Sequence, residues 1–445
     1  MLLVAAAASC SSASRPPASP DEVNPGDDGD PDATMMTTGS GSSSGAPHDA
    51  GGPKDDATTS ASCTSIQTDA GTAVLSTCAG QCVNTLTDPA NCGGCGQSCG
   101  VTGTACKSGN CVCTSPKVVC NNQCVDITSD ASNCGFCGHT CQGNPCTAGL
   151  CQASNIAQVT VSNERISGIA VDSTTVYWTQ GTGSAAGAYG KPFAGGSAVP
   201  FGAAVDPRGI VVNPTNVYWV DYGTGSVTSA ALLGGAPVHL IPAVGDGGTS
   251  PGPIAITSDS QNVYWVDSTL GTVNQMPLQG GSIVTLASNR LTPVAIAVDA
   301  ANVYWVDYGS AGSPGSVNKV PIGMPDAVTP LAPGEQLPSG IAVDGTSVYW
   351  TDRVNPSGTV KSISIQGGSA NTIAQNQGAP YGVAVDSQFV YWTNYDDNTV
   401  IKAPLAGGMS YTLASGQNNP SAIAVDDKNV YWANQGSGFI LKVAK

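Results

Sequence analysis

Residues 303–307 read Val-Tyr-Trp-Val-Asp, and the triplet Val-Tyr-Trp decides the fold because it recurs along the chain. Its tryptophans, the only seven in the protein, stand at positions 178, 219, 265, 305, 350, 392 and 432. They are separated by 41, 46, 40, 45, 42 and 40 residues, about 42 on average. This period is typical of a propeller blade of four β-strands. The repeats predict an all-β protein with a seven-bladed β-propeller over residues 155–445.

Each repeat contains the patterns of four strands. An apolar strand such as 296–299 comes first, and the Val-Tyr-Trp strand follows four to six residues later, close enough for a tight hairpin. An alternating strand such as 272–278 leads to a Gly-Gly pair, which can supply the positive φ angles of a two-residue hairpin. A fourth strand such as 282–286 ends the blade.

The two ends of the repeat region predict how the ring closes. The seventh repeat stops after its third strand, at residues 438–445, and the strand-like stretch 156–161 precedes the first repeat. We expect this N-terminal stretch to supply the missing strand, which removes an exposed edge.

A polar residue closes the first strand of every repeat. The residues assigned to this position are Asp172, Asn213, Thr257, Asp299, Asp344, Asp386 and Asp426. A side chain repeated in every blade is expected to accept hydrogen bonds from the adjoining turn. The repeated Trp and Tyr residues are interpreted in the same way, as core between blades rather than a carbohydrate platform.

The pattern Val-Tyr-Trp-x-Asp resembles the YWTD propeller repeats of lipoprotein-receptor ectodomains, and more loosely NHL-type propellers. The aspartates of this pattern are Asp221, Asp267, Asp307 and Asp352, and Gln180, Asn394 and Asn434 replace it elsewhere. Those receptors have six blades, whereas this chain has seven repeats. The resemblance implies extracellular binding and nothing narrower, because propellers carry many unrelated activities.

All 17 cysteines lie at or before Cys151, and 16 of them form two modules with the same spacing, 63–111 and 113–151. Eight cysteines per module can pair into four disulfides and leave Cys10 over. A zinc site built from Cys92, Cys95, Cys134 and Cys137 is the alternative. The modules resemble short cysteine-rich repeats of myxobacterial surface proteins, which implies an extracellular spacer or interaction module.

The N-terminal region indicates where the protein acts. Residues 1–10 resemble a bacterial lipoprotein signal that ends at the lipidated Cys10, although no Lys or Arg precedes the apolar run. Residues 11–62 are rich in Ser, Pro, Gly and Asp and predict a disordered tether. We therefore expect an extracytoplasmic lipoprotein of the outer membrane or cell surface, anchored through its lipid.

The amino-acid composition limits the kinds of molecule that the protein is expected to bind. The net charge of −16 disfavours nucleic-acid binding, which needs basic side chains against phosphates. We expect a monomer that binds a surface protein, a peptide or a glycan.

Candidate binding residues lie where the repeats differ. The loops after the Trp strands carry Tyr222, Tyr308 and Tyr395, with Asp396 and Asp397 beside the last. If these loops open on one face, they form an aromatic, mildly acidic rim. The long insertions at 245–253 and 309–315 are further candidates.

The propeller region contains few side chains suited to acid–base or nucleophilic catalysis. It holds one histidine, His239, two glutamates and no cysteine, so we name no catalytic residue and favour binding over catalysis. The alternative is a metal-dependent propeller hydrolase or lyase, resembling lactonases, esterases or streptogramin lyases. No cofactor is expected, although a calcium ion in the ring would favour this alternative.

Overall fold

The computed structural model describes residues 63, 66–68, 71–73, 75–99, 104–113, 117–121, 123–159, 165–181, 184–242, 251–310 and 312–445. The described residues form strands and turns without a helix, so this part of the chain holds no helix able to span a membrane. Cys10 and the predicted tether lie outside the described residues.

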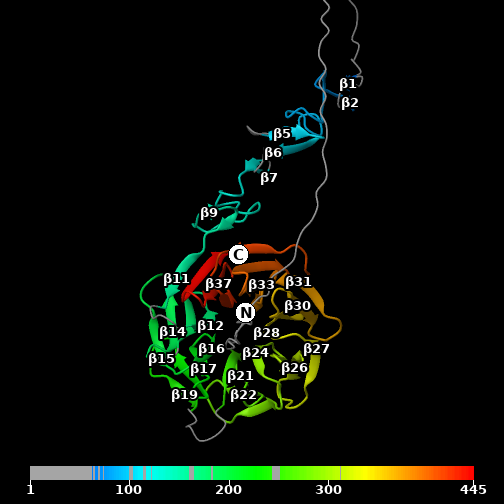
Figure 1. The fold of residues 1–445 in the computed structure, drawn as a ribbon. Helices are drawn as coiled ribbons and strands as arrows, with labels where there is room; N and C mark the ends of the chain where they lie inside the picture. Colours follow the sequence, from blue (N-terminus) through cyan, green and yellow to red (C-terminus); the bar gives the residue numbers. More distant parts are fainter. Residues whose placement is uncertain are drawn as a thin grey trace, which may run out of the picture. The chain divides into compact units, whose positions relative to one another are not determined.

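Seven antiparallel sheets of four strands follow one another around a ring and form the predicted propeller (Figure 1). The first strands are β12 (Ile166–Val171), β16 (Pro207–Val212), β20 (Pro253–Ser258), β24 (Pro293–Val298), β28 (Pro338–Val343), β32 (Pro380–Val385) and β36 (Pro420–Val425). Each first strand contacts the first strand of the next blade, and β36 contacts β12, so these strands line the centre of the ring. They are buried on both faces because each sheet lies between two others, which explains their continuous apolar sequence.

The second strands carry the Val-Tyr-Trp triplets and bury every tryptophan. They are β13 (Thr175–Gln180), β17 (Asn216–Asp221), β21 (Asn262–Asp267), β25 (Asn302–Asp307), β29 (Ser347–Asp352), β33 (Phe389–Asn394) and β37 (Asn429–Asn434). The third strands are β14 (Gly187–Pro192), β18 (Ser226–Ala231), β22 (Thr272–Pro277), β26 (Gly315–Pro321), β30 (Gly358–Ser364), β34 (Thr399–Pro404) and β38 (Phe439–Ala444). The fourth strands are β15 (Val199–Ala203), β19 (Val238–Ile241), β23 (Val284–Ala287), β27 (Thr329–Glu335), β31 (Asn371–Gln377), β35 (Tyr411–Ala414) and β11 (Ser154–Gln158).

The last blade joins both ends of the propeller, as predicted. Strand β11 pairs antiparallel with β38, with Ser154 opposite Lys442 and Gln158 opposite Phe439. The Val159 N–H also donates to the Gly438 carbonyl at 2.8 Å. Figure 1 shows β11 beside the C-terminal strands of the chain. The closing strand begins two residues earlier than the expected stretch 156–161, and it covers the edge of β38 as the closure argument requires.

Two details of the repeat differ from the sequence prediction. In the third blade the turn acceptor is Asp259 rather than Thr257, because Asp259 Oδ1 accepts the N–H groups of Gln261 and Asn262 at 2.7 Å. The Gly-Gly pairs do have positive φ, but the connection that contains them runs over six residues from Pro192 to Val199, so it is no two-residue hairpin.

The turn acceptors also fix the repeated tyrosines. Asp299 Oδ1 accepts the N–H groups of Ala301 and Asn302, and its Oδ2 accepts the Tyr304 hydroxyl at 2.7 Å. Burial and the adjacent carboxylate together raise the pKa of Tyr304. The repeated polar residue therefore holds the turn of its own blade, as the sequence predicted, and it also holds the tyrosine of that blade, which the sequence analysis did not predict.

The cysteine modules have identical disulfide connectivity. In order along each module, the first cysteine pairs with the third, the second with the fifth, the fourth with the seventh and the sixth with the eighth. The pairs are Cys63–Cys82, Cys78–Cys95, Cys92–Cys106 and Cys99–Cys111, then Cys113–Cys124, Cys120–Cys137, Cys134–Cys146 and Cys141–Cys151.

Short strand pairs frame the modules. They are β1 (Ile66–Thr68) with β2 (Gly71–Ala73), β3 (Ser76–Cys78) with β4 (Gln81–Val83), β5 (Thr104–Lys107) with β6 (Asn110–Cys113), β7 (Val118–Cys120) with β8 (Gln123–Val125), and β9 (Cys146–Thr147) with β10 (Leu150–Cys151). By internal contacts the described chain separates into two units, and the second module belongs to the same unit as the propeller.

The second module packs on the last two blades. Phe136 stacks on His139 with ring centroids 4.6 Å apart and lies 5.6 Å from Tyr411 of β35. The buried Lys402 ammonium lies 5.3 Å from the Phe136 ring, and burial lowers the pKa of this lysine. Gln142 Nε2 donates to the Lys428 carbonyl at 3.1 Å. Disulfide sulfurs and aromatic rings thus extend the propeller core into this module.

Candidate functional site

The antiparallel strand order gives the propeller two distinct faces. One face carries the loops between the second and third strands and the connections between blades, and we call it the interblade face. The other carries the turns between the first and second strands and between the third and fourth strands of each blade, and we call it the hairpin face. Tyr222, Tyr308 and Tyr395 directly follow second strands, so all three belong to the interblade face. They lie in three different blades, the second, fourth and sixth.

Tyr222 is the most open of the three tyrosines. Its side chain is 38% exposed, and the Arg208 guanidinium carbon lies 5.3 Å from its ring centroid. Arg208 is buried and forms an ion pair with Asp206 at 2.6 Å. Part of the Tyr222 ring is therefore exposed to solvent, and the ring lies beside an arginine whose charge is balanced by Asp206.

Tyr308 supports the core rather than a rim. It is half-buried and packs against the apolar cluster that includes Trp305. The insertion that follows it is described except for residue 311, and it is tied by paired backbone hydrogen bonds between Ser310 and Ser313. The other candidate insertion, 245–253, lies mostly outside the described residues.

Tyr395 belongs to a cluster that the sequence did not reveal. Its ring lies 6.2 Å from the ring of Tyr381, and the Arg353 guanidinium carbon lies 4.7 Å from the Tyr381 centroid and 5.1 Å from the Tyr395 centroid. Tyr381 is the second residue of β32, where the other first strands have Ser, Arg, Ile or Val. This break in the repeat was the available sequence signal.

The two aspartates beside Tyr395 order their loops. Asp396 Oδ2 accepts Asn355 Nδ2 at 2.6 Å, and Asp397 Oδ2 accepts the Gly378 N–H at 2.7 Å. Both side chains are exposed. They bind neighbouring loops on the interblade face, and neither forms an ion pair with Arg353 among the described residues.

The aspartates of the Val-Tyr-Trp-x-Asp pattern hold the interblade connections. Asp221 accepts the N–H groups of Val205, Asp206 and Gly223 at 2.8 to 3.0 Å. Asp267 binds the Gly252 N–H in the same manner at 3.0 Å. These buried carboxylates act as clamps for loops.

In the fifth blade the clamp is a charged network. Lys361 Nζ lies 2.6 Å from Glu335 Oε2 and 2.9 Å from Asp352 Oδ2. Burial and the neighbouring Glu335 raise the pKa of Asp352 to about 6. The network joins the end of strand β27 in the fourth blade to strands β29 and β30 in the fifth. Glu335 Oε2 also accepts the Trp350 indole N–H at 3.3 Å.

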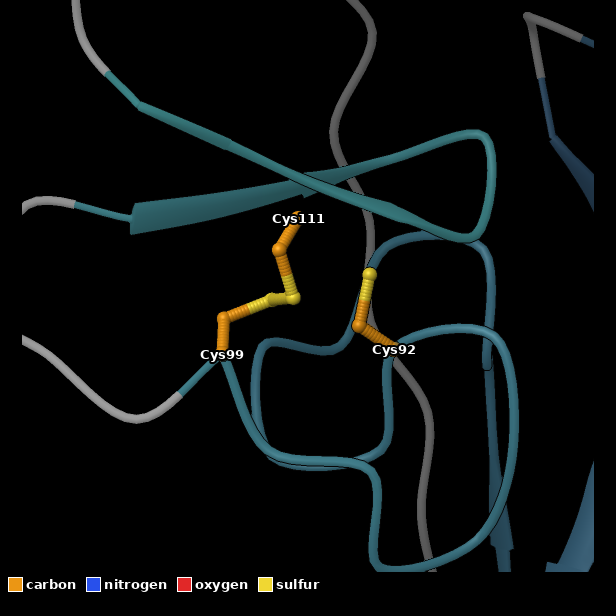
Figure 2. A group of neighbouring side chains, drawn as sticks. All are labelled: Cys92, Cys99 and Cys111. Atoms are coloured by element: carbon orange, nitrogen blue, oxygen red, sulfur yellow. A yellow bond between two sulfur atoms is a disulfide. The ribbon is translucent and has the colours of Figure 1, made fainter. Parts of the chain in front are cut away.

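Cysteine groups are the clusters of metal-ligating type in the described chain. One contains Cys92, Cys99 and Cys111, and the other contains Cys134, Cys141 and Cys151. Figure 2 shows the disulfide between Cys99 and Cys111, while Cys92 is bonded to Cys106. Because every sulfur in both groups is in a disulfide, neither group offers thiolates to zinc. The expectation of no cofactor stays a prediction, and a calcium ion in the ring belongs to the alternative function.

His239 belongs to neither of these clusters. It is exposed on β19, the outermost strand of the second blade, and its Nδ1 bonds the Thr228 hydroxyl at 2.9 Å. The bond joins strands β18 and β19 of the same blade, so the histidine helps to hold the outermost strand in place.

Exposed apolar side chains run along consecutive loops of the interblade face. We call these residues the interblade arc: Val205, Tyr222, Leu270, Leu291 and Leu337, which are 38 to 56% exposed. Two of the arc loops contact other loops of the same face. Tyr222 lies next to Gly252, where an added Cβ would come 2.7 Å from its ring, and the Arg353 N–H donates to the Leu337 carbonyl at 3.0 Å. Sequence reasoning missed the arc because single apolar residues in loops carry no periodic signal.

No protein-family model matches the chain, and a search of curated proteins gives no match. A streptogramin B lyase structure is similar, with a TM-score of 0.55 and 14% identity over 66% of this chain and 97% of the lyase. A catalytically inactive histidine-to-alanine virginiamycin B lyase from Staphylococcus aureus, solved with quinupristin, has a TM-score of 0.53 and 12% identity over 66% of this chain and 99% of its own.

A nidogen/laminin complex also matches, with a TM-score of 0.41 and 21% identity over 55% of this chain and 89% of the matched chain. At these identities the similarity to the lyases shows a shared fold alone. The chain therefore has the propeller fold of those lyases, and its function has to be argued from its own residues.

Proposed function

We propose that this chain is a non-enzymatic, extracytoplasmic binding protein that engages a surface protein, peptide or glycan through the interblade face of its propeller. The interblade arc carries the proposal. Exposed apolar side chains gathered on one face of a monomer mark interaction surfaces. The eight disulfides indicate an oxidising compartment, which agrees with a partner outside the cytoplasm. Anchoring through Cys10 is part of the proposal.

The second module supports this choice of face. Its contacts are with Tyr411, Lys428 and the end of β38, all at the hairpin face or its rim. The described contacts of the module therefore leave the interblade arc uncovered, so the arc is open to a partner.

The test compares the two faces. In one variant V205S, L270S, L291S and L337S are combined to make the arc polar. In the other, V199S, L233S, M324S and M409S remove apolar side chains that are 53 to 103% exposed at the hairpin turns and outer strands. We expect the first variant to lose binding of the purified chain to envelope preparations of the producing cell, and the second to keep it. Equal binding by both would contradict an interblade site.

The alternative, a metal-dependent lyase or hydrolase, is favoured by the fold shared with streptogramin B lyase. The related lyase variant that lacks a histidine is inactive, whereas the one propeller histidine of this chain is at a blade edge. Thermal unfolding in excess calcium and in EDTA separates the alternatives, because an ion bound only by the native state raises the unfolding temperature. A rise of many degrees, with turnover of a lactone or streptogramin B, would support the enzyme.

A further inference from the structure

The guanidinium of Arg353 lies beside two tyrosine rings whose centroids are 6.2 Å apart. Tyr381 and Tyr395 both lie within about 5 Å of its guanidinium carbon, at 4.7 and 5.1 Å. Tyr381 is buried in the first strand of its blade, and Arg353 and Tyr395 are half-buried. Cation–π contact attracts the charge of a guanidinium but provides no hydrogen-bond acceptor of the ordinary kind for its five N–H donors.

Those donors have no acceptor among the residues that the structure describes. The guanidinium of Arg353 makes no hydrogen bond or ion pair there, in contrast to Arg208 with Asp206 and Arg290 with Asp307. The chain offers carboxylates close by in sequence to Tyr395, yet Asp396 binds Asn355 and Asp397 binds the Gly378 backbone. The cation is therefore oriented without an internal counter-charge.

We propose that Arg353 binds a carboxylate of the ligand, and that the ligand is a peptide segment with an acidic side chain next to apolar ones. The proposal rests on the proposed function of the interblade face. The planar fork of a guanidinium matches a carboxylate with two parallel hydrogen bonds. Contact with the two rings limits the positions of the guanidinium before binding, which lowers the entropic cost of the contact.

The surroundings favour a peptide over an acidic glycan. The backbone of Arg353 is bonded to Leu337 of the interblade arc, so an aliphatic surface begins beside the cation. Sugars stack on open aromatic rings, whereas the rings here are turned to the guanidinium. Since the chain carries a net charge of −16, an acidic ligand meets general repulsion and depends on this one short-range pair.

The experiment uses the full, oxidised chain and an array of octapeptides rich in Leu and Val whose central residue is Glu, Gln or Lys. We expect at least tenfold tighter binding of Glu peptides than of their Gln counterparts. R353Q should erase this preference and keep the binding of the Gln peptides, while R353K, which keeps the charge without the fork, should retain part of it. K428Q, at an exposed lysine of the hairpin face, removes the same charge and should change nothing.

The outcomes separate the inference from the proposed function. Gln and Glu peptides that bind equally, but lose binding when the arc is made polar, would overturn the carboxylate site and leave the interblade site standing. A Glu preference that survives in R353Q would also overturn the inference.

Binding of polygalacturonate instead of peptides, with dependence on Arg353, would overturn the peptide assignment. Absence of any binding that depends on the arc would count against the proposed function itself. Melting temperatures of both variants close to the parent exclude a folding defect.

Discussion

A threonine one position after the tryptophan joins neighbouring blades in part of the ring. Thr351 Oγ1 accepts the Gly340 N–H of its own blade at 3.0 Å and donates to the Tyr381 carbonyl of the next blade at 2.7 Å. Thr393 repeats both bonds with Gly382 and Ser421. Where valine occupies this position, at 220, 266 and 306, blades rely on packing alone at that point.

Replacing this threonine tests the interblade bond. T351V keeps the side-chain shape but leaves the buried Gly340 N–H without its partner and the Tyr381 carbonyl with only the longer bond from Ser339, at 3.4 Å. We therefore expect a loss of about 1–3 kcal/mol in unfolding free energy. The measurement is urea unfolding followed by tryptophan fluorescence. T372V, at an exposed threonine of β31, is the matched control, and equal stability of the two variants would refute the role.

The charged clamp of the fifth blade predicts a dependence of stability on pH. The pKa of Asp352 is raised to about 6 in the folded protein, from 3.8 without the fold. Between these values the folded state binds more protons than the unfolded state, so this group lowers stability as pH rises from about 4 to 6. We expect D352N, which introduces the residue found at 394 and 434, to flatten that decline.

Urea midpoints at pH 4.5 and 6.5 measure the effect, with D427N at an exposed aspartate as the control. A decline in D352N as steep as in the parent would show that other groups cause it.

At the scale of elements, the sequence was sufficient to predict the blades and their strands, because the pattern repeats with a regular period. The seven tryptophans and the Gly-Gly pairs recur at one spacing, and each repeat folds as the same four strands. Thr257 was misassigned because this repeat lacks the Val-Asp pair that ends the first strand in most other repeats. The acceptor, Asp259, lies two residues further along the chain. The cluster of Arg353, Tyr381 and Tyr395 was not predicted, because its members come from the fifth and sixth blades and Tyr381 alone departs from the repeat.

Ring closure by β11 is a testable property of that element. A chain of residues 152–445 keeps the closing strand, whereas a chain of residues 164–445 lacks it and exposes the edge of β38. We expect the first to unfold cooperatively and the second to melt far lower or aggregate, because the last blade loses its fourth strand. Neither chain contains the cysteine modules, so the comparison isolates β11. Equal melting temperatures, measured by circular dichroism, would refute closure.

The docking of the second module depends on two side chains that the first module lacks. Phe136 and His139 correspond to Gly94 and Gln97 in the aligned spacing. We therefore expect F136G combined with H139Q to release the module, because the stacked rings against Tyr411 disappear. Faster hydrogen exchange at β35 and at the C-terminal end of β38 is the measurement. The reciprocal change, G94F with Q97H, should leave those strands protected, and unchanged exchange in the first variant would contradict the docking role.

At the scale of the whole molecule, two kinds of stabilisation are separated along the chain. The modules depend on eight disulfides, whereas residues 152–445 contain no cysteine and hold all seven tryptophans in a packed core. Small domains with little apolar core need such covalent links, and larger ones do not. Tryptophan fluorescence therefore reports on the propeller alone, even in the full protein.

This separation predicts the response to a reductant. We expect reduction to unfold both modules, seen as protease sensitivity between residues 63 and 151, while the tryptophan signal keeps its cooperative transition. The midpoint should fall modestly, because Cys134, Cys141 and Cys151 share one buried apolar cluster with residues of the last two blades and that packing is lost. The chain of residues 152–445 lacks this contact and should show one midpoint with or without reductant. If reduction abolished the tryptophan transition of the full protein but spared the shorter chain, unfolded modules would be destabilising the propeller, and the two parts would not be independent in stability.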